Sequence, residues 1–245
     1  MMAKNTADIE EMLEYLQLDR MAEGLDRLAR TPGFPSFTPI QALRELITEE
    51  YVAQKNYRTE KSLRLGKLKG CNAQMENLRT GNGRIYNDNI ISQLATLEFI
   101  QDRRNLCILG ESGAGKTYAA KAFGVAACNA DYRVHFADFT MLLDDLCILK
   151  RRDLAKYQKK VRYFARIQVL ILDDFLITHI EEERAIILFT LLKQRDELGT
   201  STIVSSQYNP ETWNRYLGVS DDYAMPDGIR RRLIDQGFVL LVEKA

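Results

Sequence analysis

The sequence predicts an α/β protein in which a parallel five-stranded sheet is flanked by helices and preceded by a small helical domain. From about residue 85 onward, short apolar runs alternate with longer helical patterns, which is typical of a parallel sheet with crossover helices. The run QVLILDD at residues 168–174 is apolar without alternation, as expected of a strand buried on both faces. Before residue 75 the apolar spacing is helical, so we expect two domains, residues 1–75 and 76–245.

The N-terminal domain is expected to contain two helices. Apolar residues at helical spacing predict the first helix over residues 8–30. The segment TPGFPSFTP (31–39) holds three of the five prolines and predicts a turn or linker. Thr38 followed by Pro39 is typical of a helix start, with Thr38 as the N-cap, and predicts a second helix that continues to about residue 68. Residues 69–87 are interpreted as a joint between the domains.

In the second domain, predicted strands and helices follow one another in a regular order. Each apolar run has the length of a strand, and each helical pattern is long enough to cross back over a sheet. The expected strands cover residues 105–110, 132–138, 168–174, 201–207 and 237–243, and the expected helices cover 117–130, about 139–149 and 181–198.

The composition is that of an ordinary globular protein, with 46% hydrophobic and 28% charged residues in a chain of 245. The sequence has no run of eighteen apolar residues and begins with a polar, acidic segment, so we expect no membrane span, no secretory signal and a cytoplasmic location. The four cysteines are widely spaced without a C-x-x-C pair. Cys107 and Cys128 lie in apolar segments and are expected to be buried, reduced thiols.

A phosphate-binding loop is predicted at GESGAGKT, residues 110–117, between a strand and a helix. The glycines let successive backbone N–H groups point at phosphate oxygens, and the helix that follows adds its positive N-terminal end. Lys116 is expected to reach the β- and γ-phosphates of ATP, and the Thr117 hydroxyl to ligate Mg²⁺. The predicted nucleotide-binding residues are Gly110, Glu111, Ser112, Gly113, Ala114, Gly115, Lys116, Thr117 and Tyr118.

Two acids follow the buried strand, at the sheet edge where ligands of parallel α/β proteins bind. Asp173 is the expected partner of Mg²⁺, and Asp174 is expected to orient or deprotonate the attacking water. Adjacent residues of a strand face opposite ways, so the two acids should have separate roles. At the end of the next strand, Ser206 and Gln207 are candidate sensors of the γ-phosphate, although a strand leading into an Asn-Pro turn accounts for them equally well.

The formal net charge is zero, but basic residues gather in two segments, 51–70 and 150–166. The first row recurs at every third position and would wind around a helix, which fits either a DNA groove or a solvated helix between domains. The second segment predicts sequence-independent contact with the phosphate backbone of DNA. The candidate DNA-binding residues are Lys55, Arg58, Lys61, Arg64 and Lys67 in the first segment, and Arg151, Arg152, Lys156, Lys159 and Lys160 in the second.

These motifs and their order resemble the IstB-like ATPases of the AAA+ superfamily, the ATP-dependent helpers of insertion-sequence transposases, which are related to bacterial helicase loaders. The agreement covers nearly the whole chain and is strongest over residues 90–237, with VLILDDF, STIVSSQYNPETW and DGIRRRLIDQG in the family order. The resemblance implies an AAA+ fold, ATP hydrolysis at the interfaces of a homo-oligomer, duplex DNA and a transposase as partners, and stimulation by DNA. The family's aspartate-arginine-leucine triplet aligns with Arg231-Arg232-Leu233, which makes Arg232 the implied catalytic arginine that reaches a neighbouring subunit's ATP.

The chain also departs from the family pattern. Glu111 and Ser112 replace two prolines of the loop, and Asp174 stands where AAA+ proteins often carry glutamate. Few residues follow the fifth predicted strand, so we expect no C-terminal helical lid and assign no sensor arginine to one. Three alternatives stay open: a helicase loader that binds single-stranded DNA, a P-loop phosphotransferase, and an ATP-switched DNA scaffold that does not hydrolyse ATP.

Overall fold

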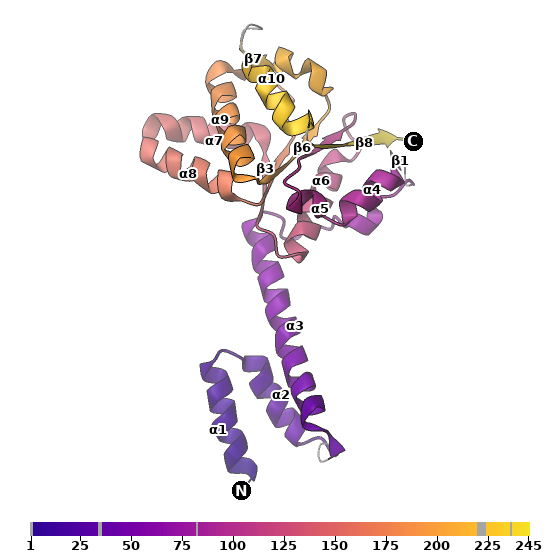
Figure 1. Cartoon of the computed structure of the whole chain (residues 1–245), viewed down its shortest axis with the longest axis vertical. Helices are drawn as coiled ribbons and strands as arrows, with labels where there is room; N and C mark the ends of the chain where they lie inside the picture. The colour runs from indigo at the N-terminus through magenta and orange to yellow at the C-terminus, as the bar shows by residue number, and fades with distance from the viewer. Residues whose placement is uncertain (1, 34–35, 82, 220–223, 236) are drawn as a thin grey trace. The chain divides into compact units, whose positions relative to one another are not determined.

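A computed structural model describes residues 2–33, 36–81, 83–219, 224–235 and 237–245 of the chain (Figure 1). The chain divides into two compact units, Met1–Lys61 and Ser62–Ala245. The division falls earlier than residue 75, inside helix α3 (Pro39–Leu65). The reason is that the expected joint packs on the second unit: Leu68 and Ala73 are buried in its core, and the Asn77 side-chain amide donates to the Tyr118 hydroxyl at 3.0 Å.

The first unit contains α1 (Met2–Tyr15), α2 (Asp19–Ala29) and the first part of α3. The single helix predicted over residues 8–30 is wrong, because the chain turns at Gln17, whose φ of 59° is left-handed. The start of α3 is confirmed: the Gln41 amide donates to Thr38 Oγ1 at 3.3 Å, and the Thr38 amide donates to Gln41 Oε1 at 2.8 Å. Residues 34–35 of the predicted linker lie outside the described residues.

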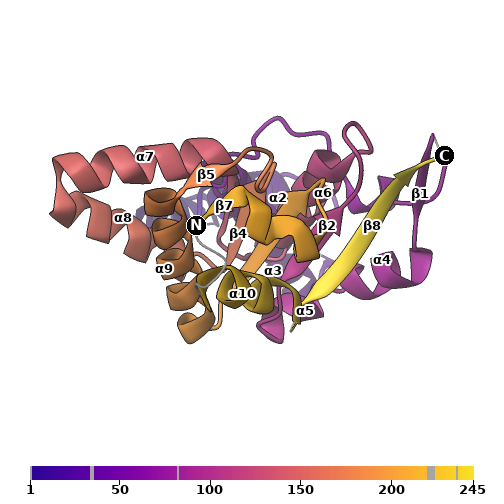
Figure 2. The same ribbon diagram turned by 90° about the horizontal axis from the view of Figure 1, so that it is seen from above.

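The second unit is built on a six-stranded sheet in the order β1-β8-β2-β6-β4-β3. The five predicted parallel strands are confirmed, and β1 pairs antiparallel with β8 at one end of the sheet, beside the C-terminus (Figure 2). β1 was not predicted because three residues, RIY, are too few to show a strand pattern. The strands are β1 Arg84–Tyr86, β2 Leu106–Leu109, β3 Val134–Asp138, β4 Val169–Asp173, β6 Ser201–Ser206 and β8 Phe238–Lys244.

Helices cover both faces of this sheet (Figures 1 and 2). The basic stretch 150–166 divides into the end of α7 and the whole of α8, because the Asp153 carboxylate caps α8 by accepting from the Lys156 amide at 2.9 Å. The helices are α4 Asp88–Ala95, α5 Glu98–Gln101, α6 Lys116–Asn129, α7 Phe139–Arg152, α8 Leu154–Arg166, α9 Glu182–Leu198 and α10 Ala224–Arg230. Shorter elements are the 3-10 helices Met75–Asn77 and Pro210–Tyr216, the π-helical turn Arg231–Asp235, and the parallel pair β5 Ile180–Glu181 and β7 Leu217–Gly218.

Strand β4 is buried along its whole length, as its apolar run predicted. Val169 and Ile171 pack in the core on the α6 side of the sheet, while Leu170 and Leu172 pack in the core formed with α7, α8 and α9. This double burial leaves only the carboxyl end of β4 able to present polar groups, and that end carries Asp173.

Cys107 and Cys128 are buried and free, as predicted. No helix within the described ranges is long and apolar enough to cross a membrane.

We expect the free energy of unfolding to depend on pH through His135. This side chain lies on β3 with 6% of its surface exposed, and its Nδ1 has no hydrogen-bond partner in the described part of the chain. Burial, with Lys67 and Lys160 nearby, lowers the pKa of His135 to about 4. The unfolded chain takes up this proton near pH 6.5, so stability should fall by about 3 kcal/mol between pH 6.5 and pH 4.

Urea unfolding of wild type and His135→Phe across this pH range measures the effect. The difference between the two curves should change most between pH 6.5 and 4 and become flat at pH values well above 6.5. His179→Phe, at an exposed histidine, is the control. Parallel curves for wild type and His135→Phe would contradict the prediction.

Candidate nucleotide-binding site

The predicted loop joins β2 to α6, the strand–loop–helix order inferred from the sequence. Gly113 and Gly115 have φ values of +76° and +107°, which are left-handed and favour glycine. A Cβ on Gly110 would lie 2.2 Å from the carbonyl oxygen of Val242, so β8 packs directly against the start of the loop. Gly115 precedes the first residue of α6, and a helix N-terminus facing such a loop attracts phosphate.

Lys116 is buried at this helix start, and its Nζ donates to the carbonyl oxygen of Glu111 across the loop at 2.9 Å. Burial lowers the pKa of the Lys116 ammonium, whereas the charges of Asp174 and Asp173 raise it. The structure therefore brings the predicted lysine and both predicted acids into one electrostatic environment.

The Asp173 carboxylate, 7% exposed, accepts from two hydroxyls of neighbouring elements. Thr117 Oγ1 on α6 donates to Asp173 Oδ1 at 3.1 Å, and Ser205 Oγ on β6 donates to the same oxygen. A hydroxyl and a carboxylate side by side are hard oxygen donors of the kind that hold Mg²⁺ together with substrate phosphates. Thr117 and Asp173 therefore fit the ion that the sequence implied.

Asp174 lies just beyond β4, where its φ of 54° is left-handed. Its amide donates to Ser205 Oγ at 3.1 Å. Burial raises the pKa of the Asp174 carboxyl, and the charges of Asp173 and Asp138 raise it further. The two acids therefore have different surroundings because the chain turns at Asp174, and not through the strand alternation that we expected.

Sequence reasoning proposed Ser206 and Gln207 as sensors, but the hydroxyl that meets the acids belongs to Ser205. The Ser206 hydroxyl is buried, donates to the Phe175 carbonyl oxygen at 2.9 Å and accepts from the Tyr208 amide at 3.2 Å. Gln207 is half-buried just after β6. Strand alternation sends Ser205 and Ser206 to opposite faces, and this was the signal that could have separated them.

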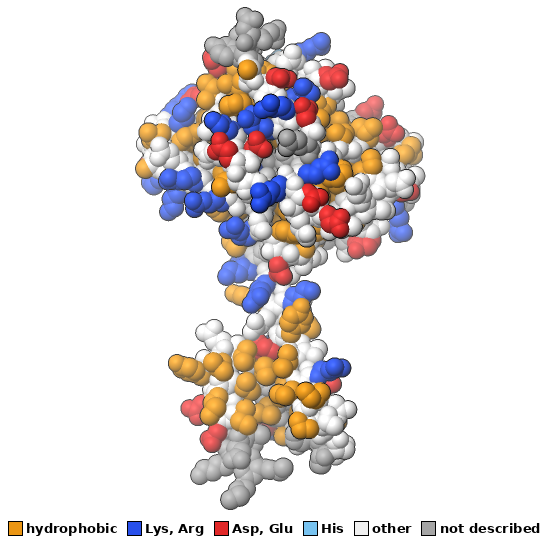
Figure 3. All heavy atoms as spheres, in the orientation of Figure 1, with side chains coloured by type: hydrophobic (Ala, Val, Ile, Leu, Met, Phe, Trp, Pro, Cys, Tyr) orange, Lys and Arg blue, Asp and Glu red, His pale blue; other side chains and the backbone are white. Residues whose placement is uncertain are grey.

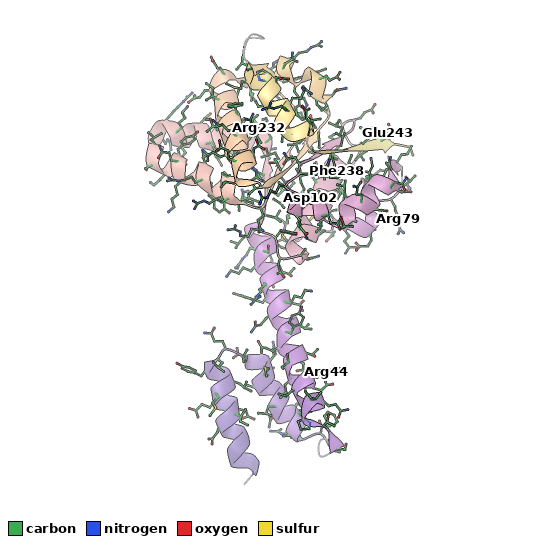
Figure 4. All side chains as sticks on the ribbon, in the orientation of Figure 1. Arg44, Arg79, Asp102, Arg232, Phe238 and Glu243 are labelled. Atoms are coloured by element: carbon green, nitrogen blue, oxygen red, sulfur yellow. The ribbon has the colours of Figure 1, made fainter. Side chains whose placement is uncertain are left out.

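Arg232 lies in the π-helical turn that follows α10 and contacts other residues of its own chain (Figure 4). Its Nη1 donates to the Gly228 carbonyl oxygen at 2.8 Å, its Nε lies 3.5 Å from Asp196, and its guanidinium lies 5.0 Å from the centre of the Phe189 ring. Its side chain is 15% exposed. The neighbouring arginines differ, since Arg230 pairs with Asp227 and Asp235 whereas Arg231 is exposed.

The basic residues of α8 form an exposed surface in the second unit (Figure 3). Two predicted cations have carboxylate partners within the chain, because Arg151 pairs with Glu183 and Lys156 with Asp153. Arg162 and Arg166 belong to the basic segment recognised in the sequence but were not among the candidate contacts. Arg133 was missed because it comes from another part of the sequence and joins the group only in the fold. Lys159, Arg162 and Arg166 line, with Arg133, a cavity of about 420 Å³.

The first basic row is interrupted in the structure. Lys55, Arg58, Lys61 and Arg64 lie exposed on α3. Lys67 follows the helix with a left-handed φ of 59°, so it does not continue the row.

A parallel sheet in the order β8-β2-β6-β4-β3, with a phosphate loop after β2 and an acid at the end of β4 bonded to Thr117, defines an ATP-binding P-loop protein of the AAA+ type. The sequence itself identifies the family. The chain belongs to the IstB-like ATP binding proteins, whose sequence pattern matches residues 11–244.

Comparison with individual proteins agrees with this assignment. The chain is 30% identical over 200 residues to the ATP-binding protein of insertion sequence IS1162 from Pseudomonas fluorescens, covering 82% of this chain and 85% of that one. Its fold is similar to the DnaC helicase loader, with a TM-score of 0.53 and 16% identity over 70% of this chain and 97% of that one. It is also similar to the replication initiator DnaA bound to AMPPCP and single-stranded DNA, with a TM-score of 0.53 and 21% identity over 72% of this chain and 51% of that one.

Gly115→Ala should weaken ATP binding at least about tenfold, which corresponds to about 1.4 kcal/mol. An alanine Cβ would lie 2.8 Å from Arg84 Nε, and the left-handed backbone adds strain of about 1–2 kcal/mol. Titration calorimetry with ATP measures the change. Gly70→Ala is a matched control, because its φ of +76° imposes similar strain with no atom within 4 Å of the added carbon. Unchanged ATP affinity in Gly115→Ala would contradict this account of the loop.

Proposed function

We propose that this chain is a Mg²⁺-dependent ATPase that assembles as a homo-oligomer on duplex DNA and assists the transposase of an insertion sequence in target selection. The observation that carries the enzymatic part is the hydrogen bond between Thr117 and Asp173, beside the buried Lys116. This arrangement combines a cation for the phosphates, oxygen ligands for a divalent ion and a second acid at the sheet edge.

Each residue then has a distinct task. Lys116 holds the β- and γ-phosphates, and Thr117 and Asp173 hold Mg²⁺, which neutralises phosphate charge when bound. Asp174 accepts the proton of the attacking water, and its raised pKa makes it a stronger base than an ordinary aspartate. Ser205 is a positioning residue, because its hydroxyl contacts both the Asp173 carboxylate and the Asp174 amide.

Arg232 supplies positive charge to the ATP of a neighbouring subunit, as the resemblance of its motif to the family implies. Within its own subunit it is held by the Gly228 carbonyl oxygen and lies near Asp196. These contacts have to open on assembly for the guanidinium to reach a partner. Turnover per subunit should therefore rise with protein concentration.

The exposed cations of α8 favour DNA as a partner, because they offer salt-dependent contacts to phosphates without reading bases. The transposase is favoured by kinship, since the similar protein of IS1162 belongs to an insertion sequence. A preference for single-stranded over duplex DNA, together with capture of a hexameric helicase, would instead identify a helicase loader.

Asp174→Asn should retain ATP binding and lower kcat by about 100-fold or more. In wild type, kcat should fall as the pH drops through the raised pKa of Asp174, because the protonated carboxyl accepts no proton. A phosphate-release assay over a pH series measures both effects. Asp145→Asn, at an exposed acid of α7, is the control. Wild-type turnover in Asp174→Asn would rule out its role as base.

Arg232→Ala should retain ATP affinity and lose turnover by about a thousandfold in the assembly. Arg230→Ala and Arg231→Ala should retain most turnover. Mixing Arg232→Ala with Lys116→Ala subunits should restore part of the activity, because each supplies what the other lacks at a shared interface. Equal losses in the three arginine variants, or no recovery on mixing, would reject Arg232 as the trans-acting residue.

The double variant Lys159→Gln/Arg162→Gln should bind duplex DNA more weakly and lose about two units of the slope of log affinity against log salt. The matched control is Arg151→Gln/Lys156→Gln, whose cations are paired within the chain and should matter less. Fluorescence anisotropy with a random-sequence duplex at several KCl concentrations measures both variants. An unchanged slope in the first variant would exclude this surface.

A further inference from the structure

Two cations outside the phosphate-loop motif lie beside its two left-handed glycines. Arg84 of β1 pairs with Lys244 of β8 across the antiparallel edge of the sheet. The Arg84 Nε and Cζ lie 2.8 and 2.9 Å from the position that a Cβ on Gly115 would occupy. Lys244 Nζ lies 3.7 Å from the corresponding position on Gly113. The edge of the sheet thus presents one cation to each of these glycines.

Arg84 is also held toward the loop by Tyr118, the residue that follows the loop threonine. The Cζ of Arg84 lies 5.5 Å from the centre of the Tyr118 ring, which is a cation–π contact. The Tyr118 hydroxyl in turn accepts from Gln74 and Asn77. The Arg84 guanidinium therefore lies at a defined place between the loop and the first turn of α6.

The positive charges of Lys116, Lys244 and Arg84 near the loop favour the binding of an anion. The Lys244 charge lowers the pKa of Lys116, in addition to the larger effect of burial. Across the residues that the structure describes, neither Arg84 nor Lys244 forms an ion pair with a carboxylate. The charges of Asp174 and Asp173 offset part of this effect on Lys116, but within the same residues they do not pair with Lys244 or Arg84, and phosphate groups beside these two cations would neutralise them.

We propose that Arg84 and Lys244 are two further phosphate contacts of the bound nucleotide, Arg84 on the Gly115 and Tyr118 side of the loop and Lys244 on the Gly113 side. This inference rests on the ATP site proposed above and adds to it one residue from β1 and one from β8. Because a triphosphate carries more negative charge than a diphosphate, the two cations favour ATP over ADP.

Titration calorimetry of the full chain with ATP and with ADP, both in the presence of Mg²⁺, tests the proposal. Arg84→Gln and Lys244→Gln should each raise the Kd for ATP about tenfold and the Kd for ADP by less. Arg84→Lys should recover part of the loss. The matched control is Arg79→Gln. Arg79 is an exposed arginine shortly before β1 (Figure 4), so this variant should bind both nucleotides like wild type. Lys244 is exposed, so Lys244→Gln reports on binding even if Arg84→Gln is poorly folded.

The outcomes separate this inference from the proposed function. If both variants bind ATP with the Kd of wild type, the inference is overturned while the proposed ATPase function stands. Tighter ATP binding by Arg84→Gln also overturns it, because the guanidinium would then be blocking the loop. An equal rise in the Kd values for ATP and ADP would overturn the proposed preference of these two cations for ATP. Absence of ATP binding in wild type overturns both proposals.

Discussion

Two hydrogen bonds to the buried carboxylate of Asp173 hold the site together. This carboxylate accepts from Thr117 at the start of α6 and from Ser205 on β6, so one side chain of β4 ties three elements together. A buried charge is costly unless hydrogen bonds satisfy it, and here both donors are hydroxyls of elements next to β4. The loop is thereby held at a defined place relative to the sheet, while both faces of β4 remain free to pack apolar side chains.

The electrostatics around this carboxylate follow from burial and neighbours acting together. The same low exposure that lowers the pKa of Lys116 also raises the pKa of Asp174, so burial disfavours both charges. Their mutual attraction opposes that effect. On the other side of the loop, Arg84 and Lys244 add positive charge without a carboxylate partner in the described chain. In the proposed site, an anion would therefore lie on the glycine side and a cation between Thr117 and Asp173.

The surfaces proposed to contact partners differ in how many contacts their side chains already make within the chain. The Arg232 guanidinium is held by the Gly228 carbonyl oxygen and lies near Asp196, so its proposed action on a neighbour requires these side-chain contacts to open. Cations of α8 such as Lys159 and Arg162 are exposed, and they are available to phosphates without rearrangement. Under the proposed function, a neighbour's ATP would have to free Arg232 from its contacts, whereas DNA would bind cations of α8 that are already exposed.

Features that depend on local patterns could be read from the amino-acid sequence. GESGAGKT specified the loop, VLILDD specified the buried strand and its two acids, and Thr38-Pro39 specified the start of α3. Only the folded chain showed the turn at Gln17, the strand β1, the hydrogen bond from the Ser205 hydroxyl to Asp173, and the position of Arg84 and Lys244 beside the loop. The physical reason is that motif glycines and apolar runs act through neighbours in the chain. The hydrogen bond from Ser205 to Asp173, and the position of Arg84 and Lys244 beside the loop glycines, depend instead on strands that pair although they are far apart in the sequence.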